Sequence, residues 1–338
     1  MKKMTLRRLV FYPLLLITIS IVFKEQIVSA FSDSYGLENS GLEKNGFDLS
    51  DALINIDEIH HGGPAKDGIP AIDKPIFIPA EKAYYLSDSD RVLGLSINGI
   101  AKAYPIKIMN YHEIVNDSFV NKDSGRETED RAVVITYCPL CGSGVAYWAN
   151  VKGKNLSFGV SGLLYNSDVL LYDRETQSLW SQLMSKAISG QQKGAELEML
   201  ALNHTAWQAW KKEFPDTLVL SEKTGFSRNY SQTPYGNYDK SQSLYFPVKK
   251  LNTQYHPKEY VIGLTISGKT KAYPFAELSK IKSPYKDTFA GQEISIVFDA
   301  KNRTGKVLDK DKNEIPTMTS FWFAWMAFYP ESVIFKGE

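Results

Sequence analysis

An internal repeat constrains this 338-residue chain more than any other feature. Residues 92–105 (VLGLSINGIAKAYP) reappear 169 positions later as residues 261–274 (VIGLTISGKTKAYP). Each copy alternates apolar and polar residues around Asn-Gly or Ser-Gly, which predicts a β-hairpin, and each then reaches a proline suited to the start of a helix. A Trp-x-x-Trp pair, at residues 207–210 and 322–325, closes each copy on a short amphipathic helix. The pattern predicts two related units.

We therefore predict an α+β fold, mainly antiparallel β, built from two pseudo-repeated units with short helices. Residues 51–250 form the predicted first repeat unit, and residues 251–338 form the second, shorter one. The first unit carries a long insertion, which is typical of successive strands joined by tight turns between residues 156 and 182. A chain of this length can bury one large core or two modest ones.

The first 30 residues have the layout of a signal peptide. A basic start precedes an uncharged, mostly apolar run at residues 9–23, and a small-x-small cleavage site follows at residues 28–30. The apolar run is short for a bilayer of about 30 Å, so we expect cleavage and an extracytoplasmic protein, either periplasmic or secreted. Without cleavage, residues 9–23 would anchor the chain in the membrane. Residues 31–50 are polar and rich in glycine and asparagine, which predicts a linker.

Charge and cysteine content argue against two classes of protein. Loss of residues 1–30 removes five basic residues and one acidic residue, so the net charge falls from +1 to −3. This balance gives no electrostatic basis for binding nucleic acid. Two cysteines are too few for a disulfide framework in an oxidising compartment. The sequence identifies no partner: an envelope protein is a candidate, and membrane contact is expected only for an uncleaved signal.

The two cysteines lie together in a Cys-Pro-Leu-Cys-Gly loop at residues 138–142, which we call the knuckle. A β-branched apolar run precedes the knuckle and a second apolar run follows it, so we predict strand, turn, strand. Pro139 fixes its own backbone and Gly142 can adopt positive φ, which lets backbone N–H groups turn toward the sulfurs. The Gly-Ser-Gly that follows disfavours a helix, whereas the Cys-x-x-Cys of thioredoxin opens one.

The knuckle is similar to those of rubredoxin-like and zinc-ribbon sites, which use two knuckles to supply four sulfurs. Because this chain has only one, a metal here needs non-cysteine ligands or must be a low-coordinate soft ion such as Cu(I). His112 and Glu113 follow the proline of the first repeat unit, and the second unit has neither this histidine nor the cysteines. We therefore predict one site in which Cys138, Cys141 and His112 bind the ion, with Glu113 orienting the imidazole.

Three polar residues of the insertion, Asn166, Asp168 and Arg174, are turn residues by default. Beside a thiol site they are also candidates for orienting the ligands or for binding an anion or a metal. The segment 225–245, rich in tyrosine, glycine and asparagine, can line a cleft or pack over a sheet. The adjacent His60 and His61 lie in a loop rich in glycine and proline and are weaker ligand candidates.

Several long motifs resemble an exported family of bacterial and archaeal proteins known as a domain of unknown function. The motifs are YCPLCGS at residues 137–143, HEIVND at 112–117, FGVSGLLYNSD at 158–168, and matching stretches within 62–73 and 172–182. The resemblance covers nearly all of the chain after the predicted signal. It implies no established activity.

The leading functional prediction is an exported metal-binding protein, with copper as the first ion and zinc or iron behind it, because thiolates and an imidazole suit Cu(I). The alternative is a thiol–disulfide oxidoreductase with Cys138 as nucleophile and His112 as base. A further alternative is a non-catalytic binding or envelope-scaffold module whose cysteines are structural. At this point the sequence leaves open whether the protein is an enzyme.

Overall fold

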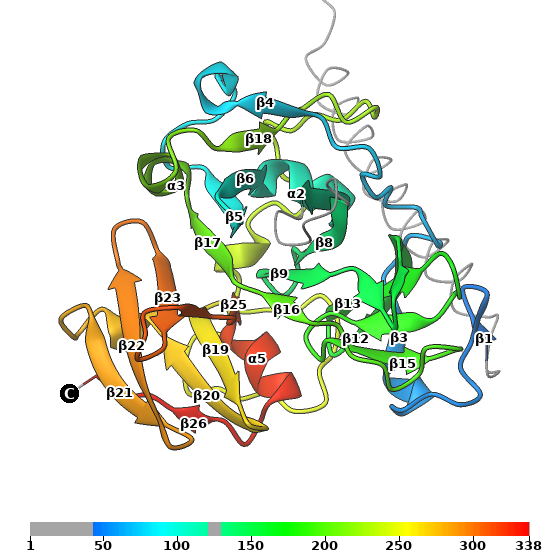
Figure 1. The fold of residues 1–338 in the computed structure, drawn as a ribbon. Coiled ribbons are helices and arrows are strands. Elements are labelled where there is room, and N and C mark those ends of the chain that lie inside the picture. Colours follow the sequence, from blue (N-terminus) through cyan, green and yellow to red (C-terminus); the bar gives the residue numbers. More distant parts are fainter. Residues whose placement is uncertain (1–42, 121–129, 338) are drawn as a thin grey trace, which may run out of the picture. The chain divides into compact units, whose positions relative to one another are not determined.

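The computed structural model describes residues 43–120 and 130–337. The predicted signal peptide and the first part of the predicted linker lie outside these residues. In the part of the chain that the structure describes, no helix is both long and apolar enough to cross a lipid bilayer. As predicted, the fold is α+β and mainly antiparallel β, with short helices (Figure 1).

The largest sheet joins strands from both predicted repeat units. In spatial order it contains β26 (Val333–Ile334), β20 (Lys269–Pro274), β19 (Tyr260–Ile266), β25 (Met318–Phe321), β9 (Ser143–Trp148), β8 (Asp130–Cys138) and β7 (Ile114–Val120), with β16 (Met199–Leu200) beside β9. The two units meet where β25 pairs with β9, at Thr319 and Gly144. The chain from Glu43 onward forms one compact unit, with no division at residue 250.

Three smaller sheets surround this one. One contains β17 (Leu202–Ala206), β5 (Arg91–Ile97), β6 (Ile100–Pro105), β18 (Leu218–Leu220) and β4 (Phe77–Pro79). The insertion forms another, with β15 (Lys186–Ser189), β14 (Leu179–Ser181), β13 (Asp168–Asp173), β12 (Phe158–Tyr165) and β3 (Ile59–His61). The third contains β21 (Tyr285–Phe289), β22 (Gln292–Asp299), β23 (Thr304–Leu308) and β24 (Glu314–Ile315).

The helices are short and follow strands directly. They are α2 (Ile106–His112), α3 (Trp207–Glu213), α4 (Phe275–Leu278) and α5 (Trp322–Phe328), with 3₁₀ turns at Ile56–Glu58, Ala80–Lys82 and Tyr238–Lys240. Two-residue strands form two further hairpins, β1 (Glu43–Lys44) with β2 (Phe47–Asp48) and β10 (Asn150–Val151) with β11 (Lys154–Asn155). Most of the hydrogen-bonded framework is therefore sheet.

The hairpins predicted from the repeated segment have the same register. Leu93 pairs with Tyr104 in β5–β6, and Ile262 pairs with Tyr273 in β19–β20. Each hairpin ends at its proline, which precedes α2 in one case and α4 in the other. The Asn-Gly and Ser-Gly turns both have positive φ at their two central residues, the geometry that matches the twist of a two-residue hairpin.

Each repeated hairpin also packs against one tryptophan through a glycine. A Cβ atom on Gly94 would lie 2.3 Å from the ring of Trp210, and one on Gly263 would lie 2.0 Å from the ring of Trp325. Each indole N–H donates to a side-chain hydroxyl seven residues further on, at 2.9 Å. The second tryptophan of each Trp-x-x-Trp pair is therefore fixed by both packing and hydrogen bonding.

Residues 43–50, expected to belong to a linker, are part of the folded unit instead. The β1–β2 hairpin places Phe47 in the core beside Leu49, and both side chains are only 1% exposed. The Phe47 ring lies 5.3 Å from that of Tyr172 in β13. Burial of two apolar side chains attaches this polar segment to the sheet of the insertion, and the Asn45 amide adds a hydrogen bond to the carbonyl oxygen of Ser161 at 3.0 Å.

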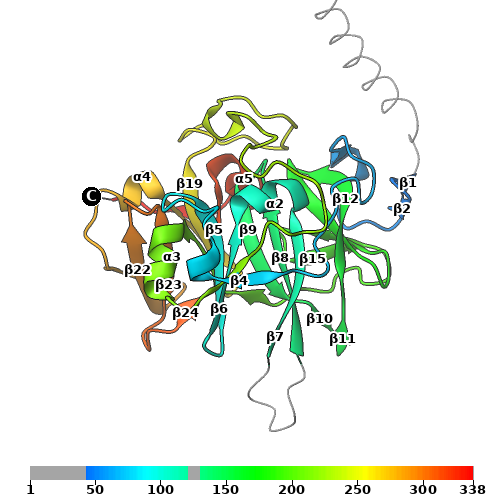
Figure 2. The ribbon, with the colours of Figure 1, turned by 90° about the horizontal axis from the view of Figure 1, so that it is seen from above.

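The long segment between β18 and β19 crosses above α2 and α5 (Figure 2). It contains little regular structure, and polar contacts attach it to the sheets. Ser167 donates to the carbonyl oxygen of Phe246 at 2.7 Å, and the Trp322 indole donates to that of Asn252 at 3.0 Å. This segment therefore covers the end of the large sheet at which the knuckle lies.

Candidate metal centre

The knuckle is the turn between β8 and β9. Cys138 pairs with Ser143 across these antiparallel strands, and the four residues between them form a turn without a helix. The predicted strand–turn–strand unit is confirmed. Gly142 adopts φ +57°, and a Cβ atom there would lie 2.8 Å from the ring of Phe321. The carbonyl oxygen of Cys141 accepts from the Phe321 N–H at 2.7 Å, so β25 supports the knuckle directly.

A second tight turn brings a carboxyl group to the sulfurs. Asn166 and Ser167 connect β12 to β13 with positive φ values of +49° and +63°, the backbone geometry that two-residue hairpin turns favour. This geometry places Asp168 at the first position of β13. The carbonyl oxygen of Ser167 lies 3.7 Å from the sulfur of Cys138 and 3.3 Å from that of Cys141, and it accepts from both thiols.

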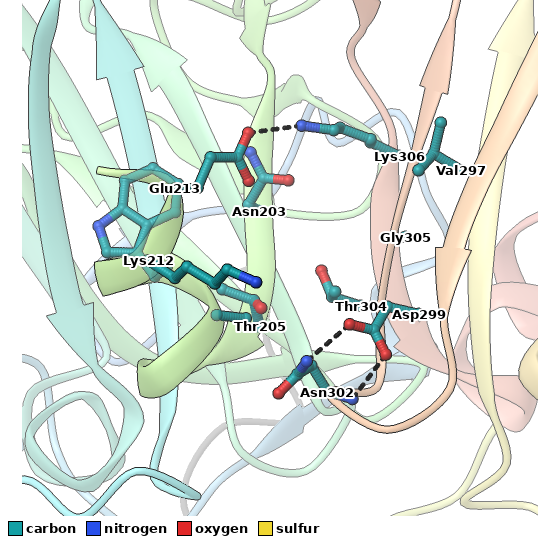
Figure 3. Close-up of a pocket in the computed structure, with 12 residues that line it drawn as sticks. Asn203, Thr205, Lys212, Glu213, Val297, Asp299, Asn302, Thr304, Gly305 and Lys306 are labelled. Carbon is teal, nitrogen blue, oxygen red and sulfur yellow. Dashed lines mark hydrogen bonds and ion pairs between the residues drawn. The ribbon is translucent and has the colours of Figure 1, made fainter. Parts of the chain in front are cut away.

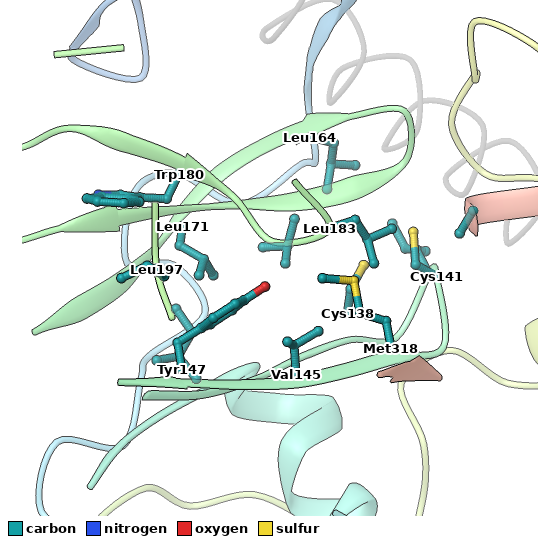
Figure 4. Packing of buried hydrophobic residues seen from close by; sticks show 14 of the residues in the cluster. Cys138, Cys141, Val145, Tyr147, Leu164, Leu171, Trp180, Leu183, Leu197 and Met318 are labelled. Atoms are coloured by element: carbon teal, nitrogen blue, oxygen red, sulfur yellow. The ribbon is translucent and has the colours of Figure 1, made fainter. Parts of the chain in front are cut away.

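Cys138, Cys141 and Asp168 form the candidate centre, which we call the Cys-Cys-Asp cluster. One Asp168 carboxyl oxygen and the two sulfurs all lie within 4.8 Å of one another. All three residues are buried, and both cysteines are free thiols. Figure 4 shows the two sulfur atoms close together, at the edge of the apolar side chains that fill the core. In the described residues this is the one group of its kind with the spacing of metal ligands.

Burial governs the electrostatics of the cluster. It raises the pKa of Asp168 to about 8, against the hydrogen bond that its Oδ2 accepts from the Leu183 N–H at 3.1 Å. It also raises the pKa of both thiols above their ordinary value. Oδ1 of Asp168 is buried and has no hydrogen-bond partner among the described residues. At neutral pH the cluster therefore carries three protons that a cation can displace.

Two residues of the segment between β18 and β19 (residues 221–259), which we call the covering segment, complete the surroundings of the cluster. Lys258 is 5% exposed, and its ammonium lies 4.0 Å from the centre of the Tyr238 ring and donates to the carbonyl oxygen of Ser243 at 2.9 Å. Burial lowers its pKa to about 8, while the nearby Cys141 acts in the opposite direction. The buried Tyr238 hydroxyl has no hydrogen-bond partner in the described chain. The sequence did not predict either role, because Tyr238 is one of several tyrosines in a tyrosine-rich loop and no pattern in the sequence marks Lys258.

His112 is not a member of the cluster. It is the last residue of α2 and is fully buried. Its Nδ1 lies 2.7 Å from the carbonyl oxygen of Pro70, and its Nε2 lies 2.6 Å from the hydroxyl of Tyr230. Burial lowers the pKa of the imidazole, so the neutral form is favoured. Both nitrogens therefore have partners within the fold, and Asp168 occupies the place that the sequence suggested for His112.

We predict that His112→Ala lowers stability without lowering metal content. The change leaves the Pro70 carbonyl and the Tyr230 hydroxyl without their buried partner, a cost of about 1–3 kcal/mol in the free energy of unfolding. Denaturant unfolding measures the stability, and elemental analysis of the same sample measures the metal. A fall in bound metal that matches the fall for Cys138→Ser would place His112 among the ligands.

The other predicted site residues lie around the cluster or away from it. Glu113 follows α2 with φ +57° and accepts a hydrogen bond from the Tyr235 hydroxyl at 3.1 Å, and burial raises its pKa to about 7. Asn166 accepts from the backbone N–H of Lys249 at 2.8 Å, which attaches the β12–β13 turn to the covering segment. Arg174 forms an ion pair with Asp73 at 2.6 Å and contributes nothing to the cluster.

A separate cavity of about 360 Å³ lies between α3 and strands β22 and β23 (Figure 3). None of its lining residues belongs to the Cys-Cys-Asp cluster. Its two carboxylates already have partners: Glu213 pairs with Lys306 at 2.8 Å, and Asp299 accepts from the Asn302 amide at 2.6 Å. This cavity therefore offers no unpaired acid, and the cluster remains the stronger candidate for chemistry.

Comparison with known families agrees with the resemblance noted in the sequence. The model of a family described as protein of unknown function (DUF3179) matches residues 66–332. The chain belongs to the DUF3179 family. The match includes the knuckle, the β12–β13 turn with Asp168, and both repeated hairpins. No curated protein and no solved structure shows significant similarity to the chain. Because the DUF3179 description names no activity, the case for a function depends on the site itself.

Proposed function

We propose that this DUF3179 protein is an extracytoplasmic metal-binding protein whose ion is held by Cys138 and Cys141, with Asp168 beside them as an oxygen ligand for an ion that takes one. One observation carries the proposal. The Oδ1 atom of Asp168 is fully buried, has no hydrogen-bond partner among the described residues, and belongs to a carboxyl group within reach of two free thiols. Burying an unpartnered polar atom costs free energy, and coordination of a cation would offset that cost.

Copper, as Cu(I), is the first candidate ion. Two thiolates supply the soft ligands that Cu(I) prefers, and it needs no more than a low coordination number. The raised pKa of Asp168, about 8, lets the carboxyl keep its proton at neutral pH while the thiols lose theirs to the ion. Two thiolates and Cu(I) leave one negative charge, which the buried ammonium of Lys258 beside Cys141 offsets.

Zinc is the second candidate because Asp168 also supplies a hard oxygen. Two sulfurs and one carboxylate oxygen give three protein ligands, which leaves a fourth position open as in catalytic zinc sites. The contribution of Asp168 distinguishes the two ions, because Zn²⁺ needs the ionised carboxylate as a ligand and Cu(I) does not.

Two observations favour metal binding over thiol–disulfide exchange. Exchange requires a thiolate before reaction, and burial raises the pKa of both cysteines, whereas a binding cation itself displaces the thiol protons. The turn after Cys138 also lacks the helix N-terminus that lowers the pKa of reactive thiols in such motifs. With structural cysteines alone, the buried Oδ1 of Asp168 has only the two thiols beside it as donors, whereas a cation would engage it directly.

Elemental analysis of protein taken from the exported fraction tests the proposal. We expect about one equivalent of copper or zinc per chain, and little in a Cys138→Ser/Cys141→Ser variant prepared in parallel. The mass of the same sample tests the predicted cleavage after Ala30. Metal-free protein that still takes up neither Cu(I) nor Zn²⁺ after reduction would refute the metal proposal.

A further inference from the structure

A second cavity, of about 300 Å³, adjoins the Cys-Cys-Asp cluster. Its walls include Leu140 of the knuckle and Val169, each of which is the chain neighbour of a cluster residue. The remaining walls are mainly apolar and come from β12 and from the loop that precedes β4. A volume near the lower end of the range for ligand pockets suits a small molecule.

One ionisable carboxyl group faces this cavity. Glu113 lines it and is 6% exposed, and the Tyr235 hydroxyl that donates to Glu113 lines it as well. The backbone of Glu113 is held on both sides, since its N–H donates to Met109 at 2.8 Å and its carbonyl oxygen accepts from Tyr137 at 2.7 Å. The carboxyl group is therefore a fixed feature of the cavity and not a surface side chain.

The lining selects for positive charge. None of the described residues that line the cavity is a lysine, arginine or histidine, so Glu113 is the one group among them that carries charge when ionised near neutral pH. Tyr235, Tyr245 and Phe246 supply aromatic rings, and Tyr245 is 57% exposed at the outer side. Aromatic faces together with one carboxylate are the groups that bind organic ammonium ions, through cation–π contact and a charge-assisted hydrogen bond.

We propose that this cavity binds a small organic ammonium ion, with an apolar body and one protonated amine, and that Glu113 is its counter-ion. Binding of the amine requires only the cavity. Its further role, as a ligand pocket next to the metal centre, rests on the function proposed above. The position of Leu140 and Val169 would hold the apolar body beside the cluster while the amine stays at Glu113.

Calorimetric titration of the full exported protein with three matched probes tests the proposal. Benzylamine carries the predicted charge, benzyl alcohol is its neutral analogue and benzoate is its anionic analogue. We expect benzylamine to bind on the order of tenfold or more tighter than benzyl alcohol, and benzoate to bind more weakly than both. Equal affinities, or a preference for benzoate, would overturn the assignment.

Variants identify the residues responsible. Glu113→Gln keeps the side-chain shape and should remove the preference for benzylamine, whereas Glu331→Gln, an exposed change elsewhere, should not. If Glu113→Gln does not fold, Tyr245→Ala at the exposed side of the cavity tests the proposal instead. We expect this change to lower the affinity for benzylamine about two- to fivefold. A preference for benzylamine that survives in Glu113→Gln, or an unchanged benzylamine affinity in Tyr245→Ala, refutes the proposal.

The two proposals fail separately. Benzylamine binding through Glu113 in a protein that takes up neither Cu(I) nor Zn²⁺ after reduction would refute the metal centre and leave the ammonium site standing. Bound metal in a protein that does not distinguish benzylamine from benzyl alcohol would refute the ammonium site and leave the metal centre standing.

Discussion

Replacing Cys138 or Cys141 by serine is expected to lower the affinity for Cu(I) by about two to three orders of magnitude. Structural metal sites with four ligands bind with roughly 10–16 kcal/mol, so each ligand contributes about 2.5–4 kcal/mol. Cu(I) in this site depends on two thiolates, and the serine hydroxyl is a poor ligand for a soft ion. Competition with a chelator of known Cu(I) affinity measures the change.

The same titration on Asp168→Asn separates the candidate ions. For Cu(I) the asparagine should cost less than tenfold in affinity, because the carboxyl group is not required as a ligand. For Zn²⁺ it should cost as much as a cysteine, because one of three protein ligands is lost. Ser143→Ala, which removes a buried hydroxyl beside the knuckle, is the matched control and should leave both affinities unchanged. Unchanged Cu(I) binding in either cysteine variant would contradict the proposed site.

The second large effect is a loss of stability of the metal-free protein as pH rises from about 4 to about 8. Asp168 has an ordinary pKa of 3.8 and a pKa of about 8 in the fold. Between these values the folded state binds more protons than the unfolded state, so the free energy of unfolding falls with rising pH. The stabilisation is fully present below pH 4 and is lost as pH passes 8, on the order of a few kcal/mol in total.

Asp168→Asn isolates this effect from other titrations. Glu113, with a pKa of about 7 in the fold, also lowers the free energy of unfolding as pH rises, over a lower pH range. The lowered pKa values of the buried His112 and His204 act in the opposite direction. The difference in unfolding free energy between wild type and variant removes these shared contributions. We expect the difference to move in favour of the asparagine variant as pH rises from 5 to 8 in the presence of a chelator. A difference that does not depend on pH would show that Asp168 titrates normally.

Local patterns were sufficient to predict the elements that local chemistry determines. The β-branched run before Cys138 and the glycine at residue 142 determine a strand and a turn through backbone preferences alone. The Asn-Gly and Ser-Gly turns of the repeated hairpins are specified in the same way. For this reason the knuckle and both hairpins were predicted in their observed positions.

The membership of the cluster depended on contacts that the sequence does not express. Asp168 was predicted to lie behind the ligands, yet the turn at Asn166 and Ser167 brings its carboxyl group directly to the sulfurs. His112 drew attention because it shares a repeat unit with the cysteines, but a carbonyl group 42 residues earlier and a hydroxyl 118 residues later engage its ring. Partners so distant along the chain follow only from the assembled fold.

The hydrogen bond between Phe321 and the knuckle has a consequence for the order in which the molecule is completed. Phe321 lies 180 residues after Cys141, and Lys258 lies more than 100 residues after it. A chain made from its N-terminus forms the thiol pair long before the strand and the ammonium that enclose it. An ion that reaches the sulfurs in that interval enters from water, whereas a later one must wait for the covering segment to open. Under the proposed function, an ion is therefore expected to enter fastest before the covering segment is in place, and the folded protein is expected to bind and release it slowly.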